Sequence, residues 1–211
     1  MSTSAPTPTP PATITLHSPS KYATTSPDTS ASASPPLTWL HRTWTVTHST
    51  LAMWRSARNV RITYSPHPPR ESDGAARIND LVEYESAGGK GGVKTVDGVD
   101  TAAASGTGVW DWRGRGWLFF VSSRWEVLGW GERPLPGGGE GAVERWVVTW
   151  FAPTLFTKEG VDIYSDRAEG GSEETVREVL AALKGLDAKP VARMCEKDMR
   201  PVEISLPWKG R

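Results

Sequence analysis

The stretch Thr43-Trp44-Thr45-Val46-Thr47-His48, TWTVTH at residues 43–48, decides the fold class, because larger side chains alternate in it with threonines. Alternation with period two places successive side chains on opposite faces of a β-strand. One face of this strand is therefore predicted to carry Trp44, Val46 and His48. The stretch NVRITY at 59–64 repeats the pattern, with Val60, Ile62 and Tyr64 together. Since Trp and Thr favour strands, the folded part is predicted to begin with two half-buried strands.

The same period continues along most of the chain. Further strands are predicted at 78–85, 93–98, 107–113, 117–121, 124–130, 145–151 and 161–165. The segments between them are rich in proline and glycine, as at 66–69 (PHPP), 86–92 (SAGGKGG) and 137–141 (GGGEG), and such segments interrupt strands. The pattern predicts eight or nine successive strands with hairpin-like connections.

One helix is predicted at 172–184. Ser172 can cap it, and two glutamates follow in the first turn, where the helix dipole favours acids. Its apolar residues recur at helical spacing and form one stripe, namely Val176, Val179, Leu180 and Leu183. Gly185 follows as a C-cap. We expect this helix to pack outside the sheet with the stripe facing inward.

The predicted fold class is all-β, an antiparallel up-and-down barrel of 8–9 strands with one C-terminal helix packed outside. Closing into a barrel is the simplest way for such a sheet to remove its exposed edges. A barrel of about eight strands is just wide enough for side chains or for one small ligand. The chain has 11 Trp against 4 Tyr and 4 Phe, and Trp serves both as core filler and as a wall for organic ligands.

The ends of the chain differ from the middle in composition. Residues 1–36 hold 8 Pro, 8 Ser, 8 Thr and 5 Ala, so they are predicted to be a disordered tail, although 13–16 alternates and can lie against the folded domain. The barrel domain is predicted at 37–187, and 188–211 is predicted to be a C-terminal tail. No apolar run forms a signal peptide or a membrane span. One cysteine, Cys195, excludes an intrachain disulfide, so the predicted location is cytoplasmic.

Charge and motifs argue against several classes of function. The 24 basic and 24 acidic residues balance, which disfavours a duplex nucleic acid or an anionic membrane as partner. The glycine-rich segments lack the residues of a phosphate-binding loop. The four histidines show no zinc-ligand spacing, and no serine-hydrolase motif occurs. We therefore predict no metal, no cofactor and no nucleic-acid partner. The sequence carries no signal for an oligomeric state.

The order of the strands resembles that of lipocalins. The opening strand around Trp44 is similar to the family's Gly-x-Trp segment, although Arg42 stands in place of the glycine. Residues 161–165, then Arg167 and the predicted helix, resemble the last lipocalin strand, its arginine and the helix after it. The most similar relatives would be fungal and short bacterial lipocalin-like proteins. The resemblance implies that Trp44 closes one end of the barrel with Arg167 packed over its ring.

Two functions remain open at this level. The first is a carrier or sensor that binds a small hydrophobic or aromatic molecule in the barrel. The second is an enzyme on the same barrel, an isomerase, cyclase or dehydratase of a hydrophobic metabolite, in which His48 or Tyr64 meets a carboxylate or an arginine. A barrel filled by tryptophan, with no ligand, is the competing interpretation. The residues predicted to line the cavity are His48, Tyr64, Tyr84, Trp112 and Trp125, with Met53 and Trp54 on the loop over its mouth.

Overall fold

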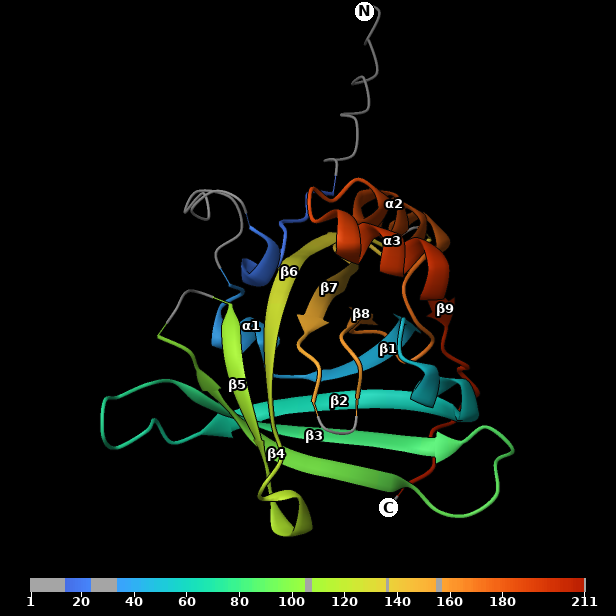
Figure 1. Ribbon diagram of the computed structural model, residues 1–211. Coiled ribbons are helices and arrows are strands. Elements are labelled where there is room, and N and C mark those ends of the chain that lie inside the picture. The colour runs from blue at the N-terminus through green and yellow to red at the C-terminus, as the bar shows by residue number, and fades with distance from the viewer. Residues whose placement is uncertain (1–13, 24–33, 105–107, 136, 155–156, 211) are drawn as a thin grey trace, which may run out of the picture.

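Eight antiparallel strands close into a barrel in the computed structural model, which describes residues 14–23, 34–104, 108–135, 137–154 and 157–210 (Figure 1). Each strand pairs with the next along the chain, and β1 pairs with both β2 and β8, which closes the sheet. The strands are β1 (Thr43–Ser49), β2 (Ala57–His67), β3 (Arg77–Ser86), β4 (Lys94–Ala102), β5 (Val109–Gly114), β6 (Ser122–Pro134), β7 (Val143–Phe151) and β8 (Gly160–Ser165). The predicted up-and-down barrel is confirmed.

One predicted strand is wrong. Residues 117–121 do not pair; the short 3-10 helix η3 (Gly116–Leu118) occupies the start of this stretch, and β6 begins only at Ser122. Trp117 and Phe119 are exposed there, because they lie in the turn between β5 and β6 and face no neighbouring strand. Aromatic composition favoured a strand, but the turn was longer than the sequence indicated.

The two faces of the barrel wall bury different sets of side chains. The interior core, formed by the inward faces of the strands, includes Trp44, Val46, Val60, Tyr64, Trp110, Trp125 and Tyr164. The outer core lies between β6, β7 and β8 and the helices, and it includes Leu128, Trp146, Trp150, Ile163, Val179 and Leu183. The tryptophans are therefore divided between the barrel interior and its outer wall.

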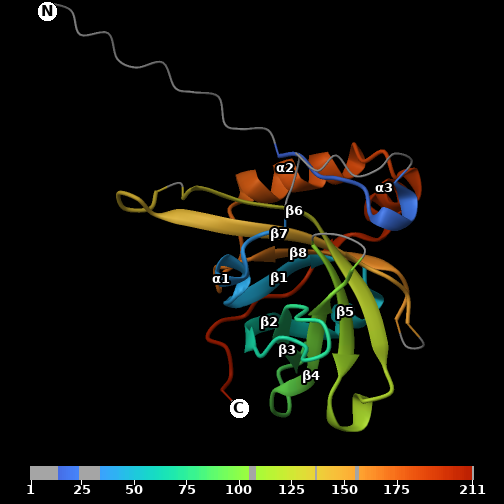
Figure 2. The same ribbon diagram turned by 90° about the vertical axis from the view of Figure 1, so that its left-hand side faces the viewer.

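Two helices, not one, cover the outer core. α2 (Glu173–Lys184) matches the predicted helix, and the Ser172 side chain accepts a hydrogen bond from the Thr175 backbone N–H as its cap. α3 (Lys189–Asp198) lies in the segment predicted to be a tail, and it buries Val191, Ala192 and Cys195. Figures 1 and 2 show both helices against one side of the barrel. The shorter α1 (Leu37–Leu40) precedes β1.

Both ends of the described chain pack on the barrel. Ile14 and Leu16 pack on the outer core, and the His17 backbone N–H donates to the Leu128 carbonyl at 2.9 Å. The 3-10 helix η1 (Ser20–Tyr22) follows. The predicted disorder of residues 1–13 and 24–33 lies outside the described residues. A two-residue strand, β9 (Arg200–Pro201), pairs with β1 on the outside of the barrel.

The C-terminal residues cover the outer face of β2 and β3. Glu83 and Glu85 point outward, yet both are buried there. The Asn59 side chain donates to Glu85 at 2.7 Å and to the Ser205 carbonyl at 2.8 Å, and Arg61 packs over the ring of Trp208. These polar residues therefore stabilise the docked C-terminus.

Candidate functional site

Four of the predicted site residues line the interior of the barrel in two aromatic pairs. The rings of Tyr64 and Trp125 stack with centroids 5.7 Å apart, and Trp54 meets the edge of Tyr84 at 5.3 Å. Trp54 belongs to the 3-10 helix η2 (Ala52–Ser56), which spans the connection between β1 and β2. We call this end of the barrel the mouth, defined by η2 together with Val82, Tyr84, Trp112 and Phe151. Those last four side chains are only partly buried.

Trp112 also lies on the inward face, across from β4. A Cβ atom on Gly98 would come within 2.3 Å of the Trp112 Nε1 atom, so the indole ring occupies the space that any side chain at 98 would fill. The Met53 side chain is 43% exposed on η2. The structure thus places Trp112 in the wall and Met53 on the outer surface of the mouth.

His48 does not share a face with Trp44 and Val46, and that prediction is wrong. The pairing of β1 with β8 shifts register between Val46 and His48, so Val46 lies opposite Tyr164 but His48 lies opposite Ile163. A β-bulge adds one residue to a strand and reverses which side chains face inward after it. Ser49, and not His48, therefore follows Val46 on the inward face.

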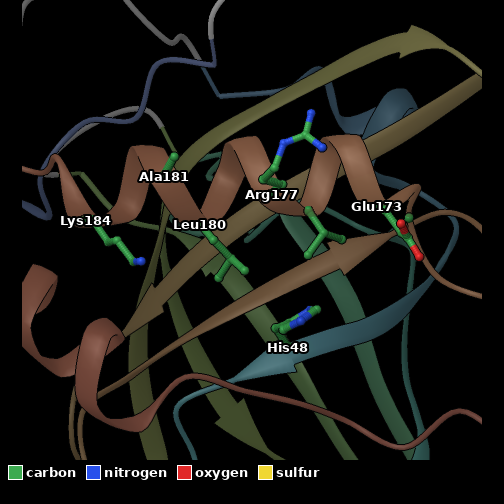
Figure 3. Close-up of a pocket in the computed structure, with 8 residues that line it drawn as sticks. His48, Glu173, Arg177, Leu180, Ala181 and Lys184 are labelled. Carbon is green, nitrogen blue, oxygen red and sulfur yellow. The ribbon is translucent and has the colours of Figure 1, made fainter.

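His48 lines a groove on the outside of the barrel instead. The groove, of about 600 Å³, lies between β1 and α2 (Figure 3). Its lining residues are His48, Gly171, Glu173, Val176, Arg177, Leu180, Ala181 and Lys184. Burial lowers the pKa of His48. This side chain is thus separated from the barrel interior by the barrel wall.

Three buried aspartates, which the sequence analysis did not select, also line the interior. Asp80 on β3, Asp100 on β4 and Asp162 on β8 are each at least nine-tenths buried. Asp100 lies opposite Ile78 of the interior core. Asp80 lies two residues from Ile78 on β3, and Asp162 lies two residues from Tyr164 on β8. Since Ile78 and Tyr164 face inward, both acids face inward as well. The Trp125 Nε1–H donates to the Asp100 Oδ1 atom at 2.7 Å.

Burial shifts the titration of these acids. It raises the pKa of Asp162 to about 7, although Ser49 and the charge of Arg55 partly offset the shift. Burial also raises the pKa of Asp80 and that of Asp100, and the charge of Asp80 raises the pKa of Asp100 further. A low-dielectric interior disfavours the charged form of a carboxyl group. Burial therefore favours the protonated form of these acids.

Several polar atoms of this cluster have no hydrogen-bond partner among the described residues. They are Asp80 Oδ1, Asp100 Oδ2, Asp162 Oδ1, Thr149 Oγ1 and Trp110 Nε1. Buried polar groups in folded proteins are nearly always paired, because an unpaired one costs about 1–3 kcal/mol. A hydrogen bond between the Asp80 and Asp100 side chains nevertheless contributes to the pKa of both, and bonds with Ser49 and Trp54 lower the pKa of Asp162. We call the three aspartates with Thr149 and Trp110 the acid cluster.

Stacked aromatic rings flank the acid cluster. Trp110 stacks on Trp125 with centroids 5.8 Å apart and an interplanar angle of 17°, and Trp125 stacks in turn on Tyr64. Burial raises the pKa of Tyr64, and Tyr164, Asp80 and Asp100 raise it further, so the Tyr64 hydroxyl lies within the field of the cluster. Flat apolar walls with a few convergent polar groups are typical of small-molecule sites.

The opposite end of the barrel is filled. Trp44 is fully buried, its Nε1–H donates to the Leu40 carbonyl at 2.9 Å, and Trp39 packs against it with centroids 5.1 Å apart. The guanidinium group of Arg42 lies over the Trp44 ring, with its Cζ atom 5.4 Å from the ring centroid. Arg167 pairs with Glu169 instead, so its expected position over Trp44 is wrong. We call this end, with Trp39, Arg42, Trp44, Trp130 and Arg145, the closed end.

Other classes of site lack support in the described part of the chain. Among the described residues, no three His, Cys, Asp or Glu side chains are placed to hold a metal ion. Burial raises the pKa of the Cys195 thiol to about 12, so a reactive thiolate is disfavoured. No described helix is long and apolar enough to span a membrane.

Comparisons by sequence give no match, either to protein-family models or to curated proteins. Comparison by structure finds apocrustacyanin C1, with a TM-score of 0.51, 12% identity, and coverage of 82% of this chain and 88% of that chain. Lobster apocrustacyanin A1 aligns over 94% of both chains, with 11% identity and a TM-score of 0.49. At these identities the likeness concerns the fold alone. Together with the closed eight-stranded barrel and the helices outside it, it shows that this chain has a lipocalin-like fold.

Proposed function

We propose that this protein is a carrier or sensor that binds one small, largely aromatic molecule inside the barrel, next to the acid cluster. The observation that carries the proposal is the stack of Trp110, Trp125 and Tyr64 on the inward face of the barrel, beside buried acids. Flat apolar walls with a few polar groups are typical of small-molecule sites. An aromatic ligand would stack on these rings and bond to the polar side chains next to them.

The mouth is the expected opening for the ligand. Tyr84 and Trp112 are only partly buried there, whereas Leu40 and Trp44 at the other end are fully buried. Trp54 of η2 lies against Tyr84 and reaches over the opening. A small displacement of η2 would therefore expose the interior without disturbing the closed end.

The enzyme alternative loses one of its two candidate groups. It required His48 or Tyr64 beside a carboxylate or an arginine inside the barrel, and His48 faces the outer groove. Tyr64 stays inside, but burial raises its pKa, which disfavours it as a base near neutral pH. We therefore favour binding over catalysis. A cytoplasmic location remains a prediction that rests on the sequence.

A titration followed by intrinsic tryptophan fluorescence tests the proposal. Four probes represent the candidate ligand classes: 2-phenylethanol, 2-naphthol, phenethylamine and oleic acid. We expect saturable quenching by at least one aromatic probe, since Trp110, Trp112 and Trp125 lie in the wall of the site. No response to any probe would contradict the proposal.

Two matched variants separate the interior from the outer groove. Val82→Trp fills the inward face between Tyr84 and Asp80, and Val176→Trp makes the same change in the groove beside α2. Calorimetric titration of the active probe is expected to lose binding in Val82→Trp and to keep it in Val176→Trp, with circular dichroism as the check on folding. The reverse result would place the site in the groove and overturn the proposal.

A further inference from the structure

We propose that the turn between β5 and β6 docks the protein on the surface of a lipid membrane, with its aromatic side chains at the boundary between headgroups and acyl chains. We call these side chains the aromatic tip, which is Trp117, Leu118, Phe119 and Phe120. Such docking is separate from the proposed function, because it needs no ligand inside the barrel. The exposure, position, size, backbone and charges of the tip support this role.

The aromatic tip holds large apolar side chains in water. Trp117 is 76% exposed and Phe119 is 67% exposed, and the ring of Phe120, which is 50% exposed, meets the Phe119 ring edge to face at 5.7 Å. The other exposed large apolar side chains among the described residues, Met53 and Leu206, lie singly in separate segments. Apolar surface gathered in one place is unfavourable in water and marks an interaction site.

The tip lies at the same end of the barrel as the mouth. In an up-and-down barrel successive connections alternate between the two ends, so the β5–β6 turn lies at the end where η2 connects β1 to β2. Figures 1 and 2 show this turn, coloured yellow-green, projecting beyond the strands that it joins. Insertion of the tip would therefore bring the mouth toward the membrane.

The size of the tip favours a lipid surface over a second protein chain. At about 200 Å² for a whole aromatic side chain, the three rings expose roughly 400 Å² together. A stable interface between two proteins buries about 800 Å² on each partner. Docking on a membrane needs no matching partner surface, because an interfacial segment only enters the headgroup boundary by about 5–10 Å.

Three backbone N–H groups of the turn are paired within it. The Leu118 N–H donates to the Arg115 carbonyl at 3.1 Å, and the Phe119 N–H donates to the Gly116 carbonyl at 3.2 Å. The Val121 N–H donates to the Leu118 carbonyl at 2.8 Å. Unpaired backbone groups are costly in an apolar environment, so this turn loses less on leaving water than an extended loop.

The charges beside the tip favour a neutral lipid surface. Arg115 pairs with Asp97 at 3.4 Å, and Arg124 pairs with Asp111 at 2.9 Å. Among the described residues Arg113 forms no ion pair, so it adds one unbalanced charge. Attraction to anionic lipid needs a cluster of cations. A zwitterionic lipid is therefore the expected partner, with burial of the rings as the source of affinity.

Co-sedimentation of the full chain with phosphatidylcholine vesicles tests the inference. We expect saturable binding, and the double variant Trp117→Ser/Phe119→Ser should weaken it at least tenfold, because both rings leave the membrane. Leu206→Ser removes an apolar side chain that is 48% exposed elsewhere, so it is the matched control and should bind as the wild type does. Phosphatidylserine added to the vesicles should strengthen binding no more than about fivefold, through Arg113.

Quenching by phosphatidylcholine with brominated acyl chains locates the tip in the membrane. Trp117→Phe keeps an apolar ring, so it should bind vesicles as the wild type does. It should lose most of the quenching that the wild type shows, since it removes the inserted indole. Equal quenching of this variant and the wild type would mean that another tryptophan contacts the lipid, and it would overturn the inference.

Other outcomes would also overturn the inference. They are no binding to vesicles, equal binding by the double variant, and binding that requires phosphatidylserine. A dimer in the absence of lipid that the double variant dissociates, measured by analytical ultracentrifugation, would assign the tip to a second copy of the chain. Probe binding in solution tests the proposed function without vesicles, and the double variant should retain it, so either proposal can fail alone.

Discussion

The closed end and the acid cluster differ in how their charged side chains are paired. At the closed end, Arg145 pairs with Glu132 at 2.8 Å and with Asp166 at 3.1 Å, and Arg42 packs over two tryptophan rings. In the acid cluster, the three aspartates are buried and form no ion pair among the described residues. Both regions are rich in tryptophan, so tryptophan content does not distinguish them.

This difference indicates a criterion: charged side chains form ion pairs in a structural region and lack them in a candidate binding site. Paired charges with filled aromatic packing stabilise the closed end. Buried acids without a protein cation cost stability when they ionise, and proteins tolerate such costs at binding sites. Four changes, taken from the largest expected effect to the smallest, test whether the two regions differ in this way.

Removing Trp44 should have the largest effect on stability. Trp44→Ala deletes a fully buried ring at the closed end and its hydrogen bond to Leu40, so we expect a loss of about 3–5 kcal/mol in the free energy of unfolding. Urea unfolding measures it. Trp112→Ala, at the mouth, should cost clearly less because its side chain is only partly buried. Equal costs would mean that the mouth is packed as tightly as the closed end.

Removing the charge of Asp162 should stabilise the protein at alkaline pH. The folded-state pKa of about 7 exceeds the reference value of 3.8, so the folded state binds more protons between these values and the free energy of unfolding falls as pH rises through that window. Asp162→Asn cannot ionise, so its advantage grows from near zero at pH 4 to at most about 4 kcal/mol at pH 8.

The control for that prediction is the acid at the closed end. Asp166 pairs with Arg42 and Arg145, so Asp166→Asn should lower stability at pH 8 and not raise it. Urea unfolding at pH 4 and pH 8 compares the two variants. An Asp162 variant that loses stability at pH 8, as the Asp166 variant does, would show that Asp162 is paired in solution.

Adding a methyl group at Gly98 should displace the Trp112 ring. The new Cβ atom would lie 2.3 Å from the Trp112 Nε1 atom, so Gly98→Ala is expected to cost about 1–3 kcal/mol through strain and to weaken probe binding. Thermal unfolding and calorimetric titration measure the two effects. Gly88→Ala, where nothing lies within 4 Å, is the control and should change neither.

The smallest effect is expected at Trp117, which is 76% exposed in the turn after β5. Trp117→Ala should change the free energy of unfolding by less than about 0.5 kcal/mol, because it lies outside both cores. Urea unfolding and fluorescence titration provide the check. A large loss of probe affinity in this variant would place part of the site on the β5–β6 turn and outside the barrel.

Most of the strands could be predicted from the sequence. Which side of the barrel wall each side chain faces could not be predicted for every residue. The alternation in β1 is regular, and nothing in TWTVTH indicates that a bulge follows Val46 and turns His48 outward. A bulge depends on pairing with β8, which is more than 100 residues away along the chain. Helix α3 was missed because its apolar stripe spans only Val191, Ala192 and Cys195.

The acid cluster was missed for a different reason. Asp80 alternates with Ile78 and Val82, so an acid on an apolar face was visible in the sequence and could have been selected. Asp162 lies in VDIYS, where both faces are largely apolar and the sequence does not indicate which one faces inward. Only the closure of the sheet places these acids in one interior, since they come from β3, β4 and β8.

A crystal structure of the protein grown with phenethylamine tests the central claim most directly. The account predicts the aromatic ring of the probe inside the barrel, against Trp125 or Tyr64. Probe density only in the outer groove beside His48, or a barrel interior filled by side chains with no room for the probe, would contradict it.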